Sequence, residues 1–280
     1  MPNYYTHLRF GAQVLGRLAA PLRLRLEGER PAFDLGCLGP DPLFFYRPTL
    51  PSAVRREGVE MHKQSALPAF QRLREALEEG QAMAAGYAAG FLCHLALDSG
   101  CHGWVNWKAA HGPVTHLAIE AEFDRMLMVR DGLDPRAGDY LPPEPDARVM
   151  AAASRAYAHT SPTQMAESYR SMKRDTALLA RLGGRRANEA VNRALSRMPL
   201  LHAVSGMLLT AKPHPAFAGT NQTMEKLTAR QVDTAAQQIA RFFLAVERGA
   251  PLDPWLDRDF NGEPVRTLFR GCRPQSTPVY

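Results

Sequence analysis

The spacing of apolar positions predicts a chain built from helices. Over long stretches, apolar residues recur three and four positions apart, which is typical of one face of an amphipathic helix. Helices are expected at 4–20, 61–79, 114–130, 147–158, 162–182, 185–198, 200–210 and 224–247. No segment shows the alternation of a strand. We therefore expect an all-α fold, a single multi-helix domain over residues 1–280, with 250–280 as a tail that wraps across the surface.

One further stretch, residues 81–107, is apolar on most of its sides and rich in alanine and glycine. Small residues permit close packing, so these residues should form a buried central helix. His94, Asp98 and His102 are unusual in such a helix. A buried carboxylate is costly unless it is paired or bound to a metal.

Histidines and carboxylates form two stripes at helical spacing. His94, Asp98 and His102 are each four residues apart, and so are His116 and Glu120 on the next helix. Residues four apart lie on one face of a helix. Converging imidazoles and carboxylates without thiols are ligands for zinc or a similar cation. A single pair of this kind is more often a surface pair, so the combination of the two stripes carries the prediction.

Three isolated residues could complete such a site, namely His7, Asp41 and His62. Asp41 lies between two prolines, whose stiff backbone can hold the carboxylate in place before a ligand arrives. Residues 31–51, rich in proline and glycine, should be a loop, or a short helix followed by a loop. The alternatives are a turn or cap aspartate, a histidine at a helix start and a surface histidine beside Glu60. The residues after Asp41 could wall an apolar pocket for substrate: Phe44, Phe45 and Tyr46.

Composition excludes some classes of protein. The net charge of +6 and the pI near 9.3 favour anionic partners, but the basic residues are spread along the chain, so nucleic acid is possible and not favoured. Four scattered cysteines indicate small buried residues instead of a disulfide framework: Cys37, Cys93, Cys101 and Cys272. No signal peptide and no apolar run of about 18 residues is seen, so a cytoplasmic location is expected. The sequence gives no indication of oligomeric state.

Taken in order, these motifs resemble the zinc-dependent phospholipase C family, whose fold is shared with the S1/P1 nucleases. The resemblance rests on Thr6-His7, Gly39-Pro40-Asp41 and His62, and on the two helical stripes. It covers roughly the first 125 residues. The later part matches only as generic helices.

The resemblance implies two or three zinc ions in a cleft of a helical domain. Asp41, His62, His94 and Asp98 would hold one zinc, and a second would be held by His102, His116 and Glu120. His7 with bridging Asp98 would hold the third. Secreted relatives complete that third site with an N-terminal tryptophan, whereas this chain begins Met1-Pro2. Their link between the residues corresponding to Asp98 and His102 is also longer.

The resemblance further implies a phosphoric ester hydrolase of the phospholipase C type. Metal-bound hydroxide would attack a phosphodiester, with Asp41 as the catalytic residue that orients or deprotonates the water. A phospholipid or another small phosphodiester would be the substrate. Two alternatives remain open: a nuclease or nucleotidase of the P1 type on the same fold, and a non-catalytic metal-binding helical module. The three aromatic residues after Asp41 could serve a lipid or a nucleotide.

Overall fold

The structure, a computed structural model, describes residues 4–48, 50–112, 114–135, 140–182, 190, 191, 194, 197 and 217–262. Over these ranges the chain is helical and has no strand, which confirms the all-α prediction. The helices are α1 Tyr4–Leu15, α2 Ala20–Gly28, α3 Arg30–Cys37, α4 Ala53–Met61, α5 Leu67–Glu78, α6 Ala84–His111, α7 His116–Arg130, α8 Ala147–Ser154, α9 Pro162–Leu182 and α11 Ala218–Arg248. Two short 3-10 helices are η1 Asp41–Phe45 and η4 Pro254–Leu256.

Several predicted elements agree with the observed ones. The central helix expected at 81–107 is α6, and α9 has the predicted bounds of 162–182. The proline-rich stretch contains the short helix α3, followed by η1. The helices predicted at 185–198 and 200–210, and most of the predicted tail, fall almost entirely outside the described residues.

The prediction of one helix over residues 61–79 is wrong. Helix α4 begins after Ser52, whose hydroxyl accepts a hydrogen bond from the Arg55 amide, and it ends at Met61. Helix α5 begins at Leu67, with Pro68 in its first turn, where a missing amide hydrogen costs nothing. His62 therefore follows one helix and does not begin the next. The helix expected at 4–20 ends earlier, at Leu15, and the next helix begins at Ala20 with Pro21 in its first turn.

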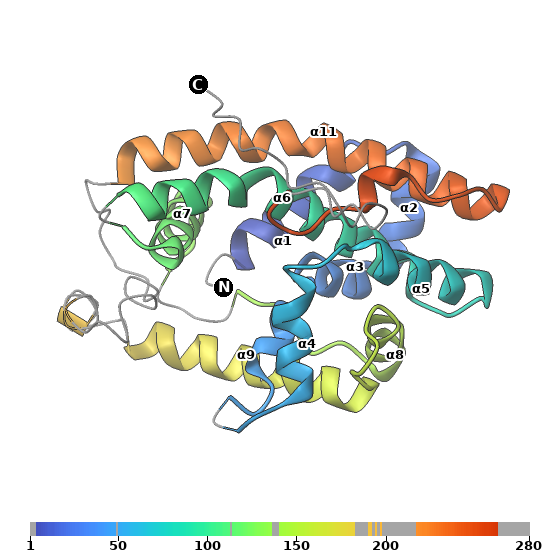
Figure 1. Cartoon of the computed structure of the whole chain (residues 1–280), viewed down its shortest axis with the longest axis horizontal. Coiled ribbons are helices and arrows are strands. Elements are labelled where there is room, and N and C mark those ends of the chain that lie inside the picture. The colour runs from blue at the N-terminus through green and yellow to red at the C-terminus, as the bar shows by residue number, and fades with distance from the viewer. Residues whose placement is uncertain are drawn as a thin grey trace, which may run out of the picture.

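Helix α6 is the centre of the fold. In Figure 1, α11 runs along one long edge of the molecule and α9 along the opposite edge, with α1, α3 and α6 between them. Helix α6 packs most extensively against α3 and next against α11. Gly90 allows the closest approach, because a Cβ atom there would lie 2.0 Å from the carbonyl oxygen of Phe33. The glycines of α6 thus bring the backbones of α3 and α6 into contact.

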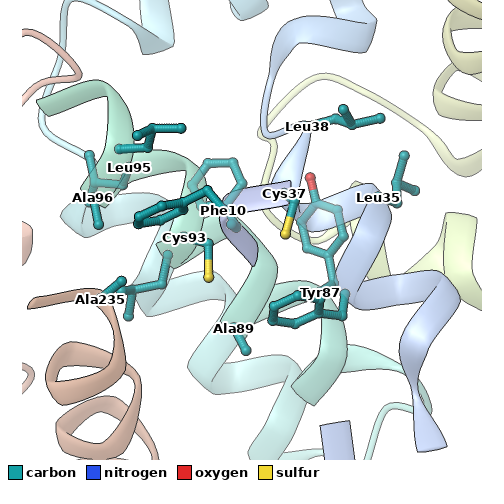
Figure 2. Packing of buried hydrophobic residues seen from close by; sticks show 14 of the residues in the cluster. Phe10, Leu35, Cys37, Leu38, Tyr87, Ala89, Cys93, Leu95, Ala96 and Ala235 are labelled. Carbon is teal, nitrogen blue, oxygen red and sulfur yellow. The ribbon is translucent and has the colours of Figure 1, made fainter. Parts of the chain in front are cut away.

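The core lies where four helices meet. Figure 2 shows Phe10 of α1, Cys37 of α3, Tyr87 of α6 and Ala235 of α11 packed together, and all four side chains are fully buried. Among the described residues, Cys37, Cys93 and Cys101 are buried free thiols, as predicted. Residue 272 lies outside the described ranges.

None of the described helices is both long and apolar enough to cross a membrane.

Candidate metal centre

The structure brings all eight predicted ligands into one cluster. They come from α1, the start of η1, the residue after α4, the middle of α6 and the start of α7. They divide by exposure into a buried side and an exposed side. The buried side consists of residues whose side chains are at most 5% exposed: His7, Asp41, His94, Asp98 and Glu120. The exposed side consists of residues whose side chains are at least 13% exposed: His62, His102 and His116.

Asp98 stands at the centre of the cluster. Its Oδ1 lies 3.2 Å from His7 Nε2 and 3.5 Å from His102 Nε2. Its Oδ2 lies 3.1 Å from His94 Nε2 and 3.9 Å from His62 Nε2. One carboxylate thus contacts imidazoles from three parts of the chain, namely α1, which packs on α6, the residue after α4, and α6 itself.

Three further contacts complete the cluster. Glu120 Oε1 lies 2.9 Å from His116 Nε2 and 3.2 Å from His102 Nε2. Asp41 Oδ1 lies 3.2 Å from His62 Nε2. A tetrahedral zinc ion with bonds of about 2.0 Å separates its ligand atoms by about 3.3 Å, which is close to these spacings.

Three groups of residues in the described part of the chain could each hold an ion, with ligand atoms that all lie within 4.8 Å of one another. They are His62 with His94 and Asp98, His102 with His116 and Glu120, and His7 with Asp41 and His94. The first two follow the sets implied by the family resemblance. The third differs, because it groups His7 with Asp41 and His94, although His7 also reaches Asp98.

Three imidazoles are oriented by bonds at Nδ1. The Nδ1 atom lies 2.8 Å from the Gly58 carbonyl in His62 and 3.0 Å from the Cys37 carbonyl in His94. In His116 it lies 2.8 Å from the side-chain oxygen of Asn106. Each acceptor favours a proton on Nδ1, so the lone pair of Nε2 faces the cluster. Outer bonds of this kind are typical of metal-binding histidines.

Within the described ranges, two buried ring nitrogens have no hydrogen-bond partner, namely His7 Nδ1 and His94 Nε2. Asp98 Oδ2 is only 3.1 Å from His94 Nε2, yet the two atoms are not aligned as donor and acceptor. Because an unpaired buried polar atom is costly, the residues fit a bound cation.

The charges in the cluster also fit a bound cation. Burial alone would raise the pKa of Asp98 and of Glu120, but the surrounding positive charges hold both values well below the usual range. Burial lowers the pKa of His102, yet the charges of Asp98 and Glu120 outweigh it and raise that pKa to about 9. Without a metal, the carboxylates therefore retain protons on a neighbouring imidazole. A divalent cation would displace those protons.

Gly39 fixes how the chain approaches His94. Its φ of 54° is in the left-handed region, and a Cβ atom there would lie 2.4 Å from the His94 ring. The Gly39 carbonyl accepts a hydrogen bond of 2.9 Å from the Tyr157 hydroxyl, which itself lies 2.7 Å from the Tyr87 hydroxyl. The turn places Asp41, two residues later, at the buried side of the cluster.

Asp124 holds the start of helix α1. This fully buried carboxylate of α7 accepts hydrogen bonds from the amides of Tyr5, at 3.2 Å, and Thr6, at 2.9 Å, and from the Thr6 hydroxyl. Burial raises the pKa of Asp124 to about 7, although these bonds act in the opposite direction. Asp124 thereby ties α7, which carries Glu120, to the turn that carries His7.

The three aromatic residues predicted to line a substrate pocket lie in different surroundings. The half-buried Phe44 ring is 5.2 Å from the His62 ring, beside the exposed side of the cluster. Phe45 packs against Tyr4 at 6.2 Å, and Tyr46 is buried, with the Arg47 guanidinium above its ring. Of the three, only Phe44 has a ring contact with a candidate ligand.

Four residues near the cluster were not predicted from the sequence. Asn106 and Asp124 occupy the next four-residue step of the stripes on α6 and α7, so the spacing itself could have identified them. Phe260 and Asn261 come from the segment after η4, and no motif marks them. The Phe260 ring is buried, at 4.9 Å from the His62 ring and 5.5 Å from the His94 ring.

Comparisons with known proteins agree with this geometry. No curated protein and no solved structure matches the chain significantly. One protein family does match, over residues 6–181, which is more than half of the 280-residue chain and includes all eight clustered residues. That family is described as zinc dependent phospholipase C. The chain belongs to the zinc-dependent phospholipase C family.

Proposed function

We propose that this protein is a phosphoric ester hydrolase that uses two or three zinc ions held by the eight clustered residues. Family membership supports a zinc-dependent phosphodiester hydrolase, and the arrangement of side chains supports the ligand set. The observation that carries the proposal is the position of Asp98, whose two oxygens face imidazoles of His7, His94 and His102. A carboxylate in that position can be shared between neighbouring ions.

The zinc ions, when bound, would polarise the phosphoryl oxygens and lower the pKa of water. The protein's own residues hold that chemistry in place. The buried carboxylates supply negative charge, and the bonds at Nδ1 keep His62, His94 and His116 turned toward the cluster. Closely spaced ions suit the cleavage of phosphoesters, because attacking and leaving oxygens can both be stabilised.

Asp41 is the proposed catalytic residue. Burial would raise its pKa, but the hydrogen bond with His62 and the charge of His94 hold that pKa below the usual range. Asp41 is therefore ionised near neutral pH and can accept a hydrogen bond from the attacking water. In the reaction the water oxygen bonds to phosphorus, and the bond from phosphorus to the leaving oxygen breaks. The leaving oxygen keeps the electron pair of that bond and takes up a proton from solvent, while the proton released by the attacking water passes to Asp41 or to solvent.

A phospholipid or another small phosphodiester is the proposed substrate. Membership of the phospholipase C family supports a lipid-like substrate. The half-buried Phe44 ring beside His62 offers an apolar surface next to the ions. Phe45 and Tyr46 remain proposed substrate contacts. Because Phe45 packs on Tyr4 and Tyr46 is buried, we expect each to contribute less to substrate binding than Phe44.

The metal content of purified protein tests the proposal first. We expect at least two zinc ions per chain and hydrolysis of p-nitrophenyl phosphocholine or bis-p-nitrophenyl phosphate that a chelator abolishes and zinc restores. Single-stranded DNA cleaved in preference to both would favour the nuclease alternative. Zinc bound without hydrolysis of any of the three would favour the non-catalytic module.

Substitution of Asp98 tests the ligand set. Asp98→Asn keeps the volume of the side chain but removes its charge, so we expect the zinc content to fall and the rate to drop by about a thousandfold or more. Asp131→Asn is the matched control, because Asp131 is outside the cluster and binds Arg9 and Tyr5. If Asp98→Asn kept its zinc and its activity, Asp98 would not be a shared ligand.

A further inference from the structure

The segment after η4 reaches the candidate metal centre from outside the matched family region, which ends at residue 181. The Ser65 hydroxyl donates to Asp257, at 2.6 Å, and the Ala66 amide donates to the Arg258 carbonyl, at 3.0 Å. These bonds fix the segment beside the residues that follow α4. Phe260 then enters the core against the rings of His62 and His94.

Two side-chain amides connect this segment to two candidate ligands. Asn106 accepts at its Oδ1 from His116 Nδ1, at 2.8 Å, and donates through its Nδ2 to Asn261 Oδ1, at 3.0 Å. Asn261 in turn donates to the backbone carbonyl of His62, at 3.4 Å. A continuous chain of bonds therefore runs from His116 on α7, through α6 and the C-terminal segment, to His62.

The chain of bonds joins the two ligands that packing holds least. The side chain of His116 is 31% exposed and that of His62 is 18% exposed, the highest values in the cluster. Buried ligands such as His94 are fixed by their neighbours on every side. Water can compete for the Nδ1 proton of an exposed imidazole. An acceptor that is itself held in place therefore does more to orient an exposed ring than a buried one.

We propose that Asn106 and Asn261 are positioning residues for zinc binding on the exposed side of the cluster. Asn106 fixes the ring and tautomer of His116, and Asn261 holds Asn106 and the backbone of His62 in register. The proposal rests on the proposed function, since it assumes that His62 and His116 bind zinc. It assigns the C-terminal segment a part in building the metal centre, although that segment lies outside the matched family region.

Zinc affinity of full-length variants tests the proposal. Competition with a chromophoric chelator gives the dissociation constant of the weakest-bound zinc. Loss of an outer partner of a ligand typically lowers metal affinity by about 10–100-fold, and we expect Asn106→Ala to fall in this range. Asn106→Asp should lose less affinity than Asn106→Ala, because its carboxylate still accepts from His116 Nδ1 although it no longer donates to Asn261 Oδ1. Asn261→Ala should lie between the two.

Two further measurements separate positioning from folding. The visible spectrum of the cobalt-substituted protein should change in Asn106→Ala and be restored in Asn106→Asp. Unfolding of the chelator-treated variants should match that of the unaltered protein, as it should for the control Lys108→Ala on the same helix. Unchanged zinc affinity in Asn106→Ala would overturn the proposal, and so would equal losses in Asn106→Ala and Asn106→Asp. An unaltered protein that binds no zinc would instead overturn the proposed function.

Discussion

The buried and exposed sides of the candidate metal centre are held by different means. His94, on the buried side, has no exposed surface, and its Nδ1 donates to the carbonyl of Cys37, a residue of α3, the helix that packs closely on α6. His116, on the exposed side, depends on the side chain of Asn106, which is held by a residue 155 positions away. The buried side is thus a product of helix packing, whereas the exposed side needs its own supporting bonds. Substitutions on the buried side should therefore lower the free energy of unfolding as well as the zinc content.

Gly39→Ala should have the largest effect on stability, since it breaks the buried side without removing a ligand. A left-handed backbone costs a residue other than glycine about 1–2 kcal/mol, and the added Cβ would meet the His94 ring at 2.4 Å. Overpacking of this kind adds about 1–3 kcal/mol. We expect the free energy of unfolding to fall by about 2–5 kcal/mol, measured by urea denaturation of the metal-free protein.

Gly80→Ala is the matched control for that prediction. Gly80 also has a positive φ, of 72°, but a Cβ atom there would meet nothing within 4 Å. Gly80→Ala should therefore show only the backbone cost and should keep its zinc. Equal losses in the two variants would mean that contact with His94 is unimportant.

Removal of one ligand from each side tests the comparison directly. His94→Ala leaves a cavity in the core and an unpaired Cys37 carbonyl, so we expect a loss of about 2–4 kcal/mol in the metal-free protein. His116→Ala removes a more exposed ring and should cost less than about 1 kcal/mol. Both variants should lose zinc. A similar loss of stability in the two would contradict the distinction between the sides.

The candidate ligands of both sides could be predicted from the sequence more completely than the residues that support them. The stripe of His94, Asp98 and His102 was visible because a helix repeats every 3.6 residues. Asn106 continues that stripe, but a carboxamide is not a usual metal ligand, so its residue type did not indicate a part in the site. His62 was predicted at the start of a helix but follows the end of one, because Ser52 begins the helix that ends at Met61 and Pro68 lies in the first turn of the next helix.

The contacts made by the segment after η4 could not be predicted. Asn261 reaches Asn106 only because the segment after η4 is held by Ser65 and Ala66, and no local pattern encodes such a contact. The left-handed conformation of Gly39 could not be predicted either, because many glycines have backbone angles that any residue can adopt. Sequence patterns thus reveal residues that share one helix, whereas tertiary packing decides which loops meet them.

Asp124→Asn should change how stability depends on pH. The pKa of Asp124 is about 7 in the folded protein and near 4 in an unfolded chain, so the folded state holds the proton more tightly. The stabilising contribution of this proton is fully present below about pH 4 and is lost as the pH rises through about 7. Asparagine does not titrate. The stability of the unaltered protein relative to Asp124→Asn should therefore fall by up to about 3 kcal/mol between pH 5 and pH 8.

The pH experiment uses metal-free protein, so that zinc does not alter the titration. Asp131→Asn is the control, because hydrogen bonds from Arg9 and Tyr5 lower the pKa of Asp131 below its usual value. That group is ionised in both states across pH 5 to 8, so its variant should show a constant difference from the unaltered protein. A constant difference for Asp124→Asn would mean that Asp124 is ionised in the folded protein.

Phe44→Ala should have the smallest effect of these substitutions. It tests whether substrate contacts the exposed side of the cluster. The Phe44 and Phe45 rings are both half-buried, but Phe44 contacts the ring of His62 and Phe45 contacts that of Tyr4. Loss of a partial apolar contact with substrate costs about 1 kcal/mol, so KM for p-nitrophenyl phosphocholine should rise roughly fivefold while kcat stays within about twofold. Phe45→Ala should lower the unfolding temperature and raise KM less than Phe44→Ala does. If KM instead rose only in Phe45→Ala, the substrate would approach from the side of Tyr4, and the exposed side of the cluster would not be its entrance.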